Sequence, residues 1–205
     1  AAYNIYSIML ILSSYSLPVA VSKMVSARLA RGQYRNARKI LRAALFYATI
    51  VGGVGFCALW FGSGFFAEHV IKMPYSAYAL KVLAPTVWIM AYLGVFRGYF
   101  QGQGTMVPTA FSQVFEQIVN AIVSVAAGSY LFNQALRVEI LKGESGLGYS
   151  NAWGAAGGTI GTGAGAFTAL LFMALLLFLY RKTMKRQVQR DRSGKTESYG
   201  EITRI

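Results

Sequence analysis

The chain contains five long apolar runs that carry almost no charged residues, and this feature limits its fold more than any other. A helix needs about 20 apolar residues to cross the hydrocarbon core of a bilayer, where its backbone groups must bond within the segment. The runs cover approximately residues 3–25, 40–66, 77–100, 106–132 and 152–180. The sequence therefore predicts an all-α, multi-pass transmembrane helical bundle over residues 1–180, followed by a basic tail over residues 181–205.

Ionisable residues are scarce and unevenly spread. Of the 20 Lys and Arg residues, seven lie from Lys23 to Arg42 and eight lie from Arg181 to the C-terminus. The net charge of +13 thus flanks apolar runs, which indicates the positive-inside rule rather than nucleic-acid binding. We expect no nucleic-acid partner, a cytoplasmic tail and an external N-terminus of the segment in the plasma membrane. Lys23 and Arg28, nearest the membrane, are expected to set topology or to attract anionic lipid head groups.

The connections between the predicted spans differ in composition. Residues 26–39 mix Arg with small apolar residues and are expected to form a short cytoplasmic connection, in part a surface helix. A tight turn is expected over residues 101–105, and a water-exposed loop over residues 135–151, where Gly, Ser and charges of both signs gather. Pro18 and Pro85 lie inside predicted spans, and because proline removes a helix hydrogen bond we expect hinges at both.

Two residues of opposite charge lie within or near the third and fourth apolar runs. Arg97 lies 11 residues before Pro108, and Glu116 lies eight residues after it. A hairpin turning between Gly102 and Pro108 would bring both to a similar depth. An ionisable residue inside a membrane usually faces a partner or a wet cavity. Either the pair lines a polar cavity, binds an anionic head group or switches with conformation, or it is a structural ion pair that fixes the hairpin.

A polar stripe continues along the fourth predicted helix. Its members share one face through the spacing i, i+3, i+4, i+7, and they are Gln113, Glu116, Gln117 and Asn120. Such a stripe cannot face lipid cheaply, so we expect it to line a hydrophilic cavity. Together with Arg97 and Gln101, these residues are the candidates for substrate contact.

Other chemistries find little support in the sequence. The glycine-rich segment 154–166 weakly echoes a dinucleotide fingerprint, but no strand precedes it, so its small residues predict a helix-packing face. The chain has no phosphate loop of the GxxxxGK type. It has a single cysteine, Cys57, and a single histidine, His69, which cannot build a zinc-type site or a catalytic set. We therefore expect no enzymatic activity, no cofactor and no metal.

Three stretches together resemble one family over nearly the whole chain. They are LPVAVSK at residues 17–23 followed by ARG at 30–32, FRGYFQG at 96–102 with MVPTA at 106–110 and SQVFEQIV at 112–119, and GAA at 154–156 with GTGAGA at 161–166. They resemble the polysaccharide biosynthesis and export proteins of Gram-positive bacteria. This group includes the stage V sporulation protein B type, within the multidrug/oligosaccharidyl-lipid/polysaccharide exporter superfamily.

The resemblance implies a flippase fold of two pseudo-symmetric lobes with about twelve to fourteen helices, which moves lipid-linked sugars by alternating access. The chain would match the second to sixth helices of the N-terminal lobe, with the first helix and the C-terminal lobe missing. The implied partners are a lipid-linked sugar substrate, membrane lipids and that C-terminal lobe. Asn120 stands where relatives often carry Arg, so no cationic role carries over to it.

Three functions remain open. The first is a flippase for a lipid-linked oligosaccharide or cell-wall precursor. The second is a cation-coupled multidrug exporter of the same superfamily, in which Glu116 would bind H⁺ or Na⁺. The third is a membrane scaffold that transports nothing and tolerates substitutions in the polar stripe.

Overall fold

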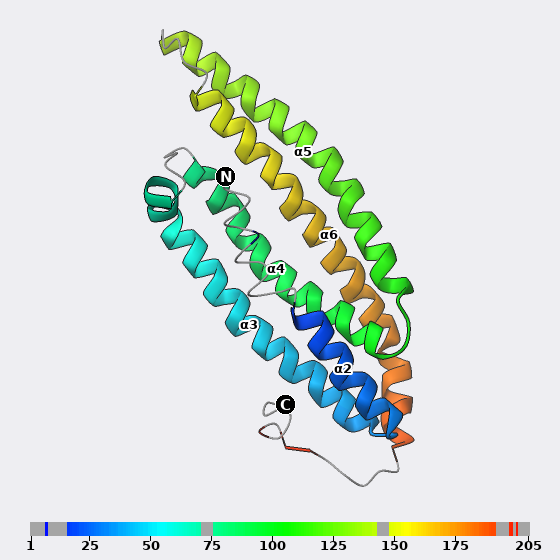
Figure 1. Ribbon diagram of the computed structural model, residues 1–205. Helices are drawn as coiled ribbons and strands as arrows, with labels where there is room; N and C mark the ends of the chain where they lie inside the picture. Colours follow the sequence, from blue (N-terminus) through cyan, green and yellow to red (C-terminus); the bar gives the residue numbers. More distant parts are fainter. Residues whose placement is uncertain are drawn as a thin grey trace.

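A computed structural model describes residues 7, 16–70, 76–142, 148–191, 197, 198 and 200. Within these ranges the chain forms helices and no strands (Figure 1). The helices are α2 (Ser16–Ala30), α3 (Tyr34–Phe65), a short π-helix η2 (Phe66–Val70), α4 (Ser76–Gly102), α5 (Val107–Lys142) and α6 (Gly148–Gln189). The predicted all-α bundle is confirmed.

Four helical stretches of the described chain are long and apolar enough to cross a membrane. They are Tyr34–His69, Ala77–Gly102, Val107–Leu141 and Gly148–Gln189. The first predicted span, residues 3–25, lies largely outside the described residues, and its last part belongs to α2. The protein is therefore a multi-pass helical membrane protein.

The helices extend beyond the predicted spans. The loop predicted over residues 135–151 is wrong in extent, because α5 continues to Lys142 and α6 begins at Gly148. Helix α6 likewise continues to Gln189, well into the predicted tail, and η2 occupies part of the expected loop at Glu68 and His69. An apolar run marks only the part of a helix that can lie in the hydrocarbon core of the bilayer. The helix itself can continue into water wherever its residues favour helical structure.

Residues 26–39, predicted to be a connection with some helix, are mostly helical. Helix α2 ends at Ala30 and α3 starts at Tyr34, so only three residues turn the chain. Gly32 adopts φ 70°, a left-handed conformation that favours glycine.

Helix α4 occupies the centre of the bundle. It packs against α2, α3 and α6, while α5 packs mainly along α6 (Figure 1). A Cβ atom at Gly98 would lie 2.6 Å from the carbonyl oxygen of Pro18, and one at Gly102 would lie 2.9 Å from that of Ser22. The two glycines therefore let α2 and α4 meet backbone to backbone.

The glycine-rich segment of α6 is the face that packs on α5. A Cβ at Gly157 would lie 2.5 Å from the carbonyl oxygen of Ala127, and one at Gly165 would lie 2.5 Å from that of Glu116. The prediction that this segment packs helices is confirmed. We call it the glycine seam, and its members are Gly157, Gly161 and Gly165.

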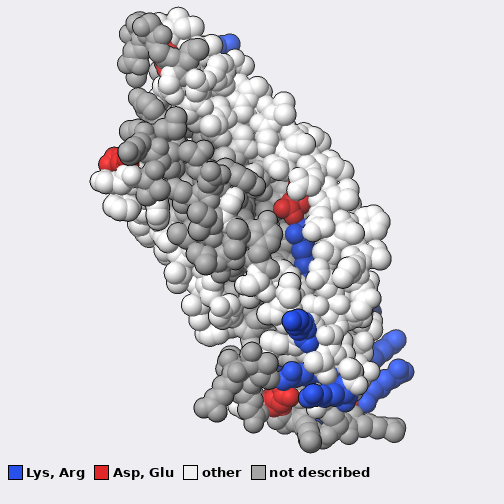
Figure 2. Space-filling model, in the orientation of Figure 1, with Lys and Arg blue, Asp and Glu red and all other residues white. Residues whose placement is uncertain are grey.

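The two ends of the bundle differ chemically. Lys and Arg side chains gather at the end where the α2–α3 turn lies beside the end of α6 (Figure 2). At the start of α6 an aromatic group forms instead, with Trp153 stacked on Tyr78 at 5.5 Å and edge-on to Tyr149 at 6.1 Å. Aromatic residues are enriched at membrane interfaces, so both ends have the composition of a bilayer boundary.

Candidate functional site

Arg97 and Glu116 form an ion pair within the apolar part of the bundle. The Nη2 atom of Arg97 donates to Oε2 of Glu116 at 2.7 Å. The two side chains are only 10% and 15% exposed, and both residues lie in helices that can cross a membrane. The predicted proximity of these two residues is confirmed.

Ser112 is a second partner of the guanidinium. Arg97 donates through Nε to the Ser112 hydroxyl oxygen at 2.9 Å, and that hydroxyl donates to the carbonyl oxygen of Thr109 at 2.7 Å. Ser112 lies one helical turn before Glu116, so both reach Arg97 from the same face of α5. Charged hydrogen bonds of this kind offset the cost of removing the guanidinium from water.

The turn between α4 and α5 positions the pair. The amide N–H groups of Gln103 and Thr105 both donate to the carbonyl oxygen of Phe100, and Gly104 takes a left-handed φ of 83°. Beyond this turn α4 and α5 have few contacts, because α5 packs against α6. The pair is therefore a specific bridge between two helices that otherwise barely touch.

The polar stripe of α5 divides between three environments. Glu116 faces Arg97, whereas half-buried Asn120 accepts a hydrogen bond from Ser124 at 2.9 Å beside the glycine seam. Gln113 and Gln117 are exposed. Within the described chain the stripe thus does not line one enclosed cavity, and its two exposed glutamines remain available to another part of the protein or to a ligand.

Gln101 is half-buried in the last turn of α4, one turn beyond Arg97. Pro18 lies in the first described turn of α2, against Gly98, and Pro85 lies exposed inside α4. Helix α4 is continuous through Pro85. A hinge role for the two prolines remains a prediction.

Of the two basic residues predicted to meet lipid head groups, Lys23 is exposed, whereas Arg28 is 7% exposed and paired with Glu197. The Nη2 atom of Arg28 lies 3.0 Å from Oε2 of Glu197. Burial and this partner leave the Arg28 guanidinium neutralised within the chain, and its role toward lipid head groups remains a prediction.

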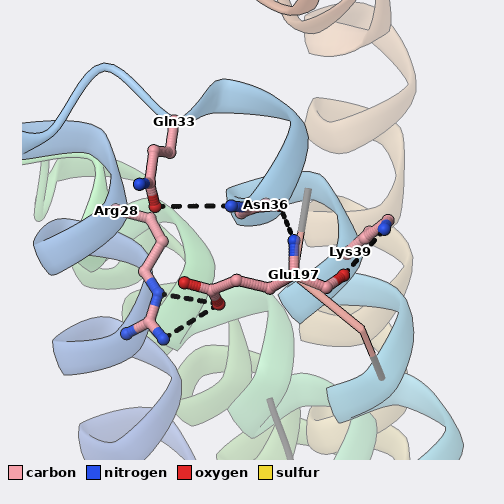
Figure 3. A network of polar contacts seen from close by, with 5 residues as sticks. All are labelled: Arg28, Gln33, Asn36, Lys39 and Glu197. Carbon is pink, nitrogen blue, oxygen red and sulfur yellow. Dashed lines mark hydrogen bonds and ion pairs between the residues drawn. The ribbon is translucent and has the colours of Figure 1, made fainter. Parts of the chain in front are cut away.

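Glu197 is held from several sides (Figure 3). Its amide donates to Asn36 at 3.0 Å, and its carbonyl oxygen accepts from Nζ of Lys39 at 2.8 Å. Closer to α6, the Asp191 carboxylate accepts from the amide of Arg35 in the first turn of α3, where a helix favours negative charge. Asp191 and Glu197 of the predicted tail therefore lie against the α2–α3 turn and the start of α3.

One further polar contact, at Glu139, was not predicted from the sequence. Glu139 is 4% exposed and accepts hydrogen bonds from the amides of Tyr149 and Ser150 and from the Ser150 hydroxyl. It thus caps the first turn of α6 from the end of α5. Among the described residues no three His, Cys, Asp or Glu side chains gather into a metal site.

The chain is similar in sequence to known proteins. A sequence profile described as polysaccharide biosynthesis protein matches residues 1–141. The chain belongs to this family. It is 33% identical over 174 residues to Stage V sporulation protein B of Bacillus subtilis (strain 168), covering 85% of this chain and 30% of that protein.

Two further proteins of the same organism are similar. Lipid II flippase MurJ is 32% identical over 133 residues, which cover 61% of this chain and 24% of that protein. Uncharacterized membrane protein YabM is 27% identical over 192 residues, which cover 94% and 32%. The chain thus spans about a third or less of the length of these relatives. No solved structure gives a significant match.

Proposed function

We propose that the complete protein is a flippase that moves a lipid-linked oligosaccharide or cell-wall precursor across the cytoplasmic membrane by alternating access. Family membership and the similarity to a protein named as a lipid II flippase support this proposal. The Arg97–Glu116 pair inside apolar helices is the observation that links the proposed transport to particular residues. An ion pair at such a position is expensive and is typical of a transport path.

Arg97 is suited to a substrate that carries phosphate. A guanidinium binds phosphate oxygens with two parallel hydrogen bonds, and it remains charged at any physiological pH. Within the chain, Nε and Nη2 of Arg97 donate to Ser112 and Glu116. A pyrophosphate would compete with Glu116 for Arg97, and the exposed Gln113 and Gln117 would offer further hydrogen bonds. Substrate arrival would thereby loosen the bridge between α4 and α5.

The remaining parts of the proposal concern the whole protein. A second lobe would face this bundle and close the cavity, and the two would rock with bending at Pro18 and Pro85. The basic end of the bundle would lie in the cytoplasm, because basic loops are retained there, and the N-terminus of the segment would lie outside.

A cation-coupled exporter is the second candidate. It would use Glu116 to bind H⁺ or Na⁺, since intramembrane carboxylates serve in such relays. The Arg97 partner at 2.7 Å favours the flippase, because the Glu116 carboxylate already has a cationic partner within the chain.

The test is transport of a fluorescent lipid-linked oligosaccharide by the complete protein in proteoliposomes. Arg97→Gln is expected to reduce the rate at least tenfold, while the matched control Arg137→Gln, an exposed arginine near the end of α5, keeps it within twofold. Normal transport by both Arg97→Gln and Glu116→Gln would remove the pair from the mechanism. Drug efflux driven by an ion gradient, without lipid-linked transport, would favour the exporter.

A further inference from the structure

A groove lies between α3 and α6 at the basic end of the bundle, away from the Arg97–Glu116 pair. Its volume is about 330 Å³, which lies at the small end of ligand-binding pockets. Nine residues line it, and they are Arg38, Leu41, Arg42, Leu45, Ala174, Leu177, Phe178, Arg181 and Met184.

Each helix contributes one continuous face to this groove. On α3 the lining residues follow i, i+3, i+4, i+7 from Arg38 to Leu45, and on α6 the same spacing runs from Ala174 to Arg181. The two helices run in opposite directions, since α3 starts and α6 ends at the basic end (Figure 1). Their arginines therefore meet at that end, whereas Leu45 and Ala174 lie deeper in the membrane-crossing part.

The groove thus changes along its length from cationic to apolar. Arg38, Arg42 and Arg181 form its charged end. The ion pairs of the described chain join Arg28 to Glu197 and Arg97 to Glu116, so neither uses these three arginines. Phe178, one of the lining residues, is 67% exposed and extends the apolar side of the groove.

We propose that this groove binds one anionic membrane phospholipid. Its phosphate would lie among Arg38, Arg42 and Arg181, and the start of an acyl chain would lie along Leu45, Leu177 and Phe178. A basic pocket between membrane helices at the cytoplasmic side suits an anionic head group, and arginine binds phosphate in a bidentate manner. A soluble phosphate would use the arginines but leave the apolar floor, with its buried Leu41 and Met184, unexplained. The proposal is independent of the transported substrate.

Native mass spectrometry of the complete protein in detergent tests this inference. The protein is titrated with phosphatidylglycerol or with phosphatidylcholine of the same acyl chains, and bound lipid is counted. Each basic residue near an anionic lipid contributes about a fivefold factor in affinity, so the variant R38Q/R42Q/R181Q is expected to lose about 100-fold of the phosphatidylglycerol affinity. Its phosphatidylcholine affinity should change little.

The matched control is K182Q/K185Q/R186Q, which removes three exposed charges from the same end of α6 outside the groove. It is expected to keep phosphatidylglycerol affinity within about threefold, because water and salt screen exposed charges that do not line the groove. The exposed single change Arg42→Gln, expected to lose about fivefold, provides the readout if the triple variant does not fold.

Two outcomes would overturn the proposal. Equal losses in the two triple variants would mean that surface charge alone attracts the lipid. Displacement of phosphatidylglycerol by millimolar inorganic phosphate would mean that the arginines hold a soluble anion rather than a phospholipid.

Discussion

Removing one partner of the Arg97–Glu116 pair should destabilise the protein far more than removing both. The side chains are 10% and 15% exposed, and the described chain offers Ser112 as the other partner of the guanidinium. Breaking a buried pair on one side costs about 3–5 kcal/mol, because the remaining charge stays buried without compensation. We expect about 3 kcal/mol for Glu116→Leu, since Ser112 still binds Arg97.

The double variant Arg97→Met/Glu116→Leu should recover most of this loss. Replacing both members of a buried pair by apolar residues of similar volume is often neutral or stabilising. The assay is equilibrium unfolding of the complete protein in mixed micelles of mild detergent and dodecyl sulfate, arranged as a double-mutant cycle. A loss below about 1 kcal/mol for Glu116→Leu, or strict additivity in the cycle, would show that water reaches the pair and would refute the reasoning.

Two further predictions concern helix packing and the tail. Gly165→Val should destabilise the α5–α6 pair by about 1–3 kcal/mol or more, because its Cβ would meet the carbonyl oxygen of Glu116. The control Gly158→Ala should leave the stability nearly unchanged in the same unfolding assay, since nothing lies within 4 Å of its added Cβ. Glu197→Gln should release the tail from the α2–α3 turn, which spin labels at exposed Arg31 and at Ser198 would report as a longer and broader distance distribution. An unchanged distribution would mean that the backbone contacts of residue 197 hold the tail without the Arg28 ion pair.

The pattern of hydrophobicity predicted the fold class because the bilayer imposes the same requirement on every crossing helix. It could not predict where helices end, and Glu139 shows why. Its carboxylate accepts from two amides at the start of α6, so a residue that suggests a loop by composition instead joins two helix ends.

The candidate site was predictable in part. Arg97 and Glu116 lie at similar distances before and after a short turn. A helical hairpin would place such residues at the same depth, so the sequence alone predicted that they lie close together. Arg28 and Glu197 are 169 positions apart, and no local pattern connects them. Helical spacing grouped Gln113, Glu116, Gln117 and Asn120 on one face, but the spacing does not say which neighbour covers each part of that face.

The glycine seam lets α5 pack against α6 without constraining the side chains by which α5 contacts other molecules. The glycines of α6 lie directly against the backbone of α5. Close packing of the two helices therefore depends little on α5 side chains that lie away from the seam. The exposed positions of α5, Gln113 and Gln117 among them, can therefore change without loss of the helix pair. Mutational drift on this helix would then alter what the protein contacts while leaving how it folds intact, and a new ligand preference could evolve one side chain at a time.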